Sequence, residues 1–111
     1  MKHDSFIEQA IKEAGKSTQR HQHGSVIVHR PKVIAKGYNK IDPFNIKTSL
    51  HAEVAAILDM KKNREQPDNV TMYVIRLGKL CGTKTSKPCM NCERSIIASG
   101  IKRVYFSSND P

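Results

Sequence analysis

The hydrophobic positions near the start of the chain recur with the spacing of a helix. They are Phe6, Ile7, Ala10, Ile11 and Ala14. Steps of three and four residues predict an amphipathic helix over residues 4–19, with a lysine-rich polar face. Ser5 with Glu8 three residues later forms a capping-box pair, so we expect this helix to begin near Ser5.

Two runs of β-branched residues follow, and they predict a hairpin. The runs cover residues 25–29 and 33–38 and flank the short link Arg30-Pro31-Lys32. Such runs on either side of a proline turn are typical of paired strands. Residues 39–49 show no sustained period and contain turn-forming residues, so we expect an irregular connection there. It leads into a helix predicted over residues 50–63.

The second half of the chain predicts two more strands and another helix. Residues 72–75, within the run from Val70, predict a third strand, and residues 78–87 predict a basic loop. A helix is expected from Pro88-Cys89 to Ser99, where Gly100 suits a left-handed cap. Residues 101–106 predict a fourth strand, reached by a right-handed parallel crossover. The predicted fold class is α/β: a three-layer α/β/α fold whose mixed sheet of four strands, a hairpin plus parallel strands, carries helices on both faces.

Length and composition narrow the class of protein. A chain of 111 residues is expected to form one domain, residues 1–111. No apolar run approaches the roughly 18 to 20 residues that cross a bilayer, and the first residues lead into an amphipathic segment rather than a signal-peptide core. We therefore expect a cytoplasmic protein with no membrane partner.

The charge balance favours partners that carry phosphate. The formal net charge is +9, although the basic residues are scattered and a solvated basic surface is the alternative explanation. Some of these residues lie on segments that border the two predicted helix starts at residues 51 and 88, and they are candidates for binding a substrate phosphate. They are Arg20, Lys40, Lys47, Lys84 and Lys87.

Two helix starts carry the residues with the most informative chemistry, His51-Ala52-Glu53 and Pro88-Cys89-Met90-Asn91-Cys92. Two cysteines three residues apart in a helix share a face and can bind a common atom. With His51 they supply three zinc ligands and leave a fourth position open, which is the pattern of a catalytic zinc. Glu53 lies close enough to His51 to act as general acid and base without binding the metal.

Other interpretations of these residues stay open at this level. The imidazole and thiols could be reduced, buried side chains or the ligands of a purely structural zinc, and Glu53 could be a solvated carboxylate that suits the helix dipole. Three cysteines in a chain without an export signal make a disulfide scaffold a poor explanation. Cys81 is therefore either a fourth zinc ligand or a free thiol. His21 and His23 are either a second metal site or exposed histidines beside a strand.

A His-x-Glu followed by a Pro-Cys-x-x-Cys is the signature of zinc nucleobase deaminases. In this order of motifs the chain resembles the cytidine and deoxycytidylate deaminase superfamily from Gly24 to Phe106, and the branch that acts on dCMP most of all. The matching blocks are Gly24–Val28, Gly37–Asn39, His51–Val54, Ser86–Cys92 and Gly100–Val104.

The resemblance implies a metal centre and a reaction. His51, Cys89 and Cys92 would hold Zn²⁺, and Glu53 would move a proton from water to the departing amine of cytosine. The expected function is zinc-dependent hydrolytic deamination of a cytosine nucleotide or nucleoside, dCMP- or cytidine-like, with release of ammonia. One alternative is a deaminase of polynucleotides, acting on tRNA adenosine or on cytosine in single-stranded DNA or RNA. Another is a non-catalytic, zinc-stabilised module that binds nucleic acid.

The resemblance also implies substrate contacts and an assembly. Asn39 would contact the sugar, although it could simply end the second strand as a turn residue. The backbone amide of Ala52 would hold the pyrimidine carbonyl, and the carbonyl of Pro88 would receive the leaving ammonia. Family members normally continue beyond the fourth strand into a further helix and strand, so we expect a C-terminally short domain. A homo-oligomer of at least two copies is also expected.

Overall fold

The computed structural model describes residues 2–18, 21–29, 32–42, 45–63, 69–77, 83–84 and 96–106. Its helices and strands are α1 (Lys2–Gly15), β1 (Gln22–His29), β2 (Lys32–Tyr38), β3 (Lys40–Asp42), β4 (Asn45–Leu50), α2 (Ala52–Lys62), β5 (Val70–Leu77), β6 (Thr83–Lys84) and β7 (Ile101–Phe106). None of the helices in these ranges has the length and apolar character that crossing a membrane requires.

One mixed sheet organises the molecule. Its strands run in the order β2-β1-β5, and both β6 and β7 pair with the far side of β5. The pairs β1–β2, β1–β5 and β5–β6 are antiparallel, whereas β5 and β7 are parallel. The predicted hairpin and the third and fourth strands are all present, and the α/β fold class is confirmed.

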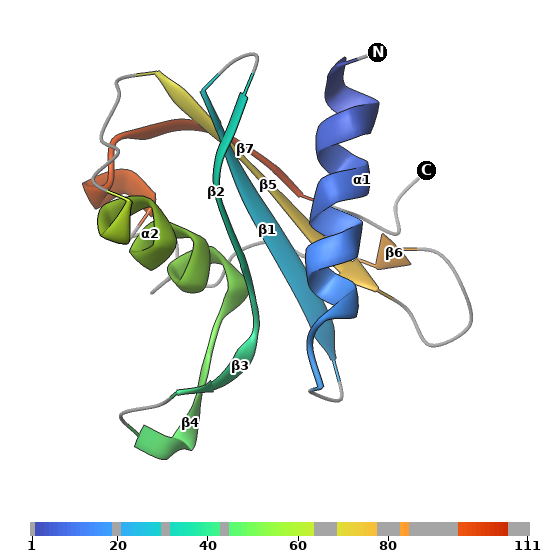
Figure 1. The fold of residues 1–111 in the computed structure, drawn as a ribbon, viewed down its shortest axis with the longest axis vertical. Helices are drawn as coiled ribbons and strands as arrows, with labels where there is room; N and C mark the ends of the chain where they lie inside the picture. Colours follow the sequence, from blue (N-terminus) through green and yellow to red (C-terminus); the bar gives the residue numbers. More distant parts are fainter. Residues whose placement is uncertain are drawn as a thin grey trace.

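The two long helices cover opposite faces of this sheet (Figure 1). Along β1 the side chains alternate between them: Val26 packs in a cluster with Phe6 of α1, and Ile27 packs in a cluster with Ala56 of α2. Because β1 is buried on both faces, its central residues form a continuous apolar run rather than an alternating one. The same holds for β5, whose Met72 faces the α2 side and whose Tyr73 faces the α1 side.

Two glycines let the helices approach the sheet closely. A Cβ atom at Gly24 would overlap the backbone of Ala10 and Ala14 in α1. A Cβ atom at Gly37 would overlap the backbone of Ala55 and Ala56 in α2. Both helices therefore lie directly against strand backbone, which only glycine permits at these positions.

The structure corrects the predicted boundaries of the first helix. Helix α1 begins at Lys2 and ends at Gly15, whereas the pattern predicted residues 4–19. Ser5 lies inside the helix instead of at its cap, so the capping-box prediction is wrong. The helix ends early because Gly15 has low helix propensity and the chain then turns towards β1.

Two segments predicted as irregular contain strands. Residues 39–49 were expected to form an irregular connection, but they contain β3 and most of β4, which pair antiparallel as a separate two-stranded sheet. The predicted basic loop contains β6, which pairs with Arg76 and Leu77 of β5. Short polar strands carry little periodic signal, and backbone pairing with another segment is what defines them.

The helix predicted to run from Cys89 to Ser99 is described only at its end. Residues 96–98 are helical, and Gly100 has a φ of +81°, the left-handed conformation expected for its cap. Pro88, Cys89 and Cys92 lie outside the described residues.

Candidate functional site

The first turn of α2 lies at one edge of the sheet, where three strand ends meet. In register, Gly37 of β2 pairs with Ser25 of β1, which pairs with Val74 of β5. Helix α2 places Ala55 over Gly37 and Asp59 beside Lys36, so it runs antiparallel to β2. Its N-terminus therefore lies near the end of β2, the start of β1 and the end of β5.

His51 occupies the capping position of α2. Its backbone is extended, with φ −71° and ψ 151°, and its carbonyl accepts the first helical hydrogen bond, 2.9 Å from the backbone nitrogen of Ala55. The imidazole makes no capping hydrogen bond, and the residue is exposed. This geometry leaves an accessible nitrogen ligand at the start of the helix.

Glu53 lies two residues further on and is buried. Its exposed fraction is 5%, and the preceding Ala52 is completely buried. The interpretation of Glu53 as a solvated surface carboxylate is therefore wrong. A carboxylate in the first turn is favoured by the positive end of the helix dipole. The pair thus consists of an exposed imidazole followed by a buried carboxylate.

Asn39 holds the corner between β2 and β1. Its Oδ1 accepts a hydrogen bond from the backbone nitrogen of His23 (2.8 Å), and its Nδ2 donates to the carbonyl of His21 (2.6 Å). Its own carbonyl accepts from the hydroxyl of Ser17 (2.8 Å). Asn39 therefore joins three segments structurally, and its contact with a sugar stays a prediction.

His21, His23 and Arg76 form a basic group at the same edge. An Nη atom of Arg76 lies 2.8 Å from Nδ1 of His21. Burial, followed by the charges of Arg76, His51 and His21, lowers the pKa of His23 to about 4. The imidazole of His23 is therefore neutral at pH 7, and these neighbours lie within electrostatic range of it.

Arg76 was not singled out from the sequence, although a signal for it exists. Val74 faces the α2 side of β5, and strand alternation puts Arg76 on that same face, two residues beyond. A basic residue at the end of an otherwise apolar buried strand was the available clue.

The described residues include one of the three predicted zinc ligands, His51. Among them, no three His, Cys, Asp or Glu side chains are grouped to hold a metal ion, and Cys81, Cys89 and Cys92 lie outside them. The second metal site considered at His21 and His23 likewise has no such group of ligands in this part of the chain. An accessible imidazole at a helix start fits zinc, which binds histidine nitrogen and cysteine sulfur.

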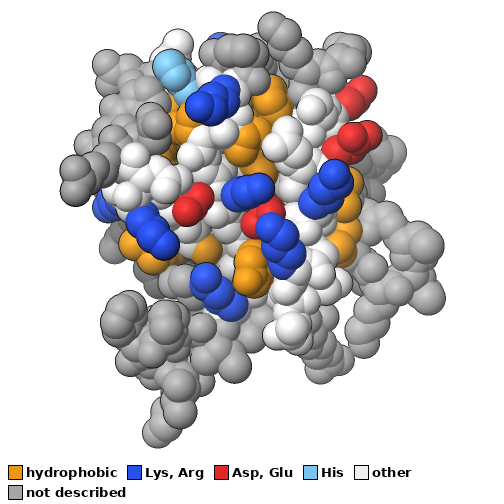
Figure 2. All heavy atoms as spheres, in the orientation of Figure 1, with side chains coloured by type: hydrophobic (Ala, Val, Ile, Leu, Met, Phe, Trp, Pro, Cys, Tyr) orange, Lys and Arg blue, Asp and Glu red, His pale blue; other side chains and the backbone are white. Residues whose placement is uncertain are grey.

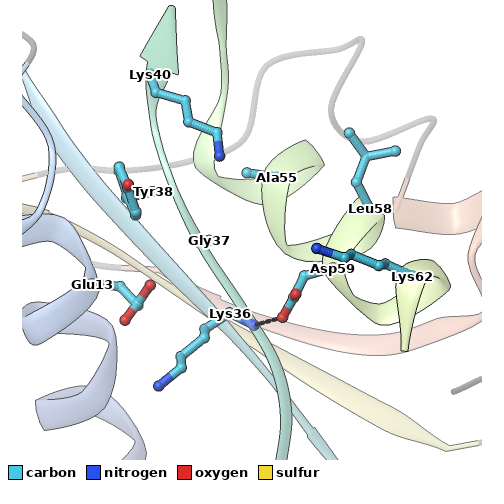
Figure 3. A pocket seen from close by; sticks show the side chains of 9 residues that line it. All are labelled: Glu13, Lys36, Gly37, Tyr38, Lys40, Ala55, Leu58, Asp59 and Lys62. Atoms are coloured by element: carbon cyan, nitrogen blue, oxygen red, sulfur yellow. Dashed lines mark hydrogen bonds between the residues drawn. The ribbon is translucent and has the colours of Figure 1, made fainter. Parts of the chain in front are cut away.

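A second concave feature, a groove along the outer flank of α2, follows the edge strand β2 (Figure 3). Of the predicted phosphate candidates, Lys40 lies in this groove with Nζ 5.4 Å from the centre of the Tyr38 ring. The side chains of Arg20, Lys47, Lys84 and Lys87 lie outside the described residues. Lys36 and Lys62 also line the groove.

The acidic residues of the groove are engaged. Glu13 pairs with Lys16 at 2.7 Å, and a carboxylate oxygen of Asp59 accepts a hydrogen bond from the backbone nitrogen of Lys36 at 3.1 Å. Figure 2 shows this face of the molecule, and near the centre of the view basic side chains surround acidic ones, with apolar patches nearby. Asp59 thereby satisfies a backbone N–H of the edge strand β2 that faces away from the sheet and has no strand partner in the described part of the chain.

Comparison with known proteins identifies several deaminases that are similar to this chain. Residues 1–108 match the family model described as the cytidine and deoxycytidylate deaminase zinc-binding region. The chain is 33% identical over 88 residues to a tRNA-specific adenosine deaminase of Buchnera aphidicola subsp. Schizaphis graminum, covering 78% of this chain and 51% of that protein. It is 32% identical over 75 residues to a deoxycytidylate deaminase of Enterobacteria phage T2, covering 67% of this chain and 35% of the relative.

A solved structure shows the same fold. The dCMP deaminase from the cyanophage S-TIM5 superimposes with a TM-score of 0.74 at 24% identity, covering 95% of this chain and 81% of that one. The chain spans about half the length of the tRNA-specific relative and about a third of the phage T2 relative.

Proposed function

The chain belongs to the family of the cytidine and deoxycytidylate deaminase zinc-binding region, and we propose that it is a zinc-dependent hydrolytic deaminase of a cytosine nucleotide or nucleoside. The observation that carries the proposal is the pair at the start of α2, exposed His51 followed by buried Glu53. Hydrolysis breaks the bond between C4 and the exocyclic nitrogen and forms a bond from C4 to the oxygen of water. One proton of water leaves with ammonia, and the other ends on N3 of the uracil product.

The proposed ligands of the metal are His51, Cys89 and Cys92. When bound, Zn²⁺ supplies Lewis acidity, which makes water a usable nucleophile near neutral pH. His51 is exposed at the helix start, where an ion and a substrate can reach it.

Glu53 is the proposed proton carrier. Its carboxylate accepts a proton from water and delivers it to the departing amine, so that ammonia leaves as a neutral molecule. Burial suits this role because it keeps bulk water from exchanging the proton before it is delivered. The backbone amide of Ala52 and the carbonyl of Pro88 are the proposed contacts of the pyrimidine carbonyl and of ammonia, and Asn39 is the proposed contact of the sugar.

The decisive experiment compares two carboxylates of the same helix. We expect Glu53→Gln to lower ammonia release from dCMP or cytidine by about 10²- to 10⁴-fold, because the amide cannot carry the proton. Elemental analysis is expected to find the same zinc content as in the unaltered protein. The matched control is Asp59→Asn on the outer flank of α2, which keeps an oxygen that can accept from Lys36.

Each outcome of this comparison has a clear meaning. Equal losses in the two variants would contradict a proton-carrying role for Glu53. If the unaltered, zinc-loaded protein releases no ammonia from any substrate and binds only nucleic acid, the chain is the non-catalytic module and the deaminase proposal is wrong.

A polynucleotide substrate is the second candidate. It is supported by the net charge of +9, by the lysines of the groove beside α2, and by the similarity to tRNA-specific adenosine deaminases. A panel of dCMP, cytidine, tRNA and single-stranded DNA, assayed at two salt concentrations, separates the candidates. Turnover of a polymer is expected to fall steeply with salt, because binding to many phosphates releases counterions.

A further inference from the structure

Arg76 lies at the edge of the candidate site and has no role in the reaction described above. In β5, Val70, Met72 and Val74 pack in the cluster beneath α2, so alternation places Arg76 on the same face. It is half-buried and pairs in register with His23 of β1. The side chain of Arg76 therefore lies at the edge of the sheet where α2 begins.

The position of the guanidinium is fixed by contacts from distant parts of the chain. The guanidinium of Arg76 forms a hydrogen bond with the imidazole of His21, which lies 55 residues earlier in the chain. The carbonyl of His21 in turn accepts a hydrogen bond from the side-chain amide of Asn39. His21 is exposed, so this end of Arg76 lies near the surface. A guanidinium held in place before binding loses less conformational freedom when a ligand arrives.

The surroundings of Arg76 are rich in imidazole groups. Arg76, His51 and His21 each lie within electrostatic range of His23, and His21 also bonds to Arg76. The carboxylates with described side chains lie elsewhere, with the exception of Glu53. Asp4 and Glu8 belong to α1, whereas Glu13 and Asp59 line the groove on the outer flank of α2, where Glu13 pairs with Lys16.

Resting on the proposed deaminase function, we infer that Arg76, positioned by His21, binds a phosphate group of the substrate. A guanidinium presents five N–H donors in a planar fork that matches two oxygens of a phosphate while another donor holds His21. The phosphate is either the monoester of a nucleotide or a diester of a polynucleotide. In both cases the substrate class is a phosphorylated nucleoside rather than a free base or nucleoside.

The test compares substrates that differ only in phosphate. Ammonia release from dCMP, from deoxycytidine and from a short cytosine-containing single-stranded DNA is measured for the unaltered protein and for Arg76→Gln. We expect the substitution to lower kcat/KM about 10- to 100-fold for the phosphorylated substrates, mainly through KM. Deoxycytidine is expected to change less than about twofold, since it offers no phosphate. Loss confined to dCMP identifies the monoester, and loss confined to DNA identifies the diester.

Two further variants keep the result interpretable. Arg76→Lys retains the charge and is expected to lose less than Arg76→Gln, while Arg103→Gln, an exposed arginine of β7, is expected to change nothing. Titration calorimetry with dUMP, with deoxyuridine and with the short single-stranded DNA supplies a readout that does not need turnover. The inference is overturned if Arg76→Gln weakens deoxycytidine turnover as much as turnover of the phosphorylated substrates, or if it changes neither dUMP binding nor binding of the short single-stranded DNA. Absence of all turnover with intact, Arg76-dependent binding of dUMP would instead overturn only the deaminase proposal.

Discussion

At the scale of single residues, two buried serines show how differently the same hydroxyl is used. Ser17 is buried and donates its hydroxyl to the carbonyl of Asn39 at 2.8 Å, which helps to hold the corner beside the candidate site. Ser25 is completely buried, and its hydroxyl has no hydrogen-bond partner in the structure as described. Burying a hydroxyl without a partner costs free energy, whereas a satisfied one contributes modestly.

We therefore expect opposite results from two similar substitutions. Ser25→Ala is expected to leave the free energy of unfolding unchanged or raise it by up to about 1 kcal/mol, because it removes an unsatisfied group. Ser17→Ala is expected to lower it by about 1–2 kcal/mol, because the carbonyl of Asn39 loses its donor. Urea unfolding of both variants measures the difference. A clear destabilisation by Ser25→Ala would show that its hydroxyl has a partner after all.

At the scale of elements, the placement of α2 on β2 determines where His51 and Glu53 lie. The helix rests directly on the backbone of the strand at Gly37, and Asp59 ties it to Lys36 further along. No side chain separates the two elements at Gly37. A small displacement of the helix would therefore move both residues of the candidate site together.

Gly37→Ala tests this coupling. The added methyl group overlaps Ala55 and Ala56, so we expect a loss of about 1–3 kcal/mol in the free energy of unfolding. Deaminase activity is expected to fall in the protein that remains folded, because the start of α2 is displaced. Gly15→Ala is the matched control: a Cβ atom there meets nothing within 4 Å, and stability should change by less than about 0.5 kcal/mol or rise. Equal effects of the two substitutions would contradict the close docking of α2.

At the scale of the whole molecule, the side of the sheet formed by β7 exposes apolar surface. Tyr105 stacks on the buried Tyr73 with ring centres 5.1 Å apart, yet 40% of Tyr105 is exposed. Phe106, at the end of β7, is 42% exposed, and Ile97, in the turn of helix before β7, is 75% exposed. Among the described strands, β7 pairs with β5 alone. An apolar strand at a sheet edge favours association unless another surface covers it.

We expect the protein to form at least a dimer that uses this edge. Light scattering of the unaltered chain should report a mass of two copies or more. Phe106→Glu is expected to shift the population towards the monomer, because it places a charge in the apolar contact. Lys36→Glu on the opposite edge strand is the control and should leave the mass unchanged. A monomer at high concentration would show that the expectation is wrong.

Local pattern was enough for much of this protein. The hairpin, the strands β5 and β7, the helix beginning beside His51 and the cap at Gly100 were all predictable. Each depends on periodicity or on a turn residue within a few positions along the chain. The family was also accessible, because its motifs combine rare residue types in short, ordered blocks. The roles of His51, Glu53, Cys89 and Cys92 follow from those motifs and stay predictions.

What local pattern could not provide depends on contacts between distant segments. The strands β3, β4 and β6 exist because they find backbone partners, and their own residues carry little periodic signal. Whether Glu53 is buried depends on how α2 lies against the sheet, and the meeting of Arg76 with His21 depends on the pairing of β1 with β5. Spacing along the chain therefore identified the residue types of the site, whereas packing in three dimensions set their burial, their charged neighbours and the residue proposed to bind phosphate.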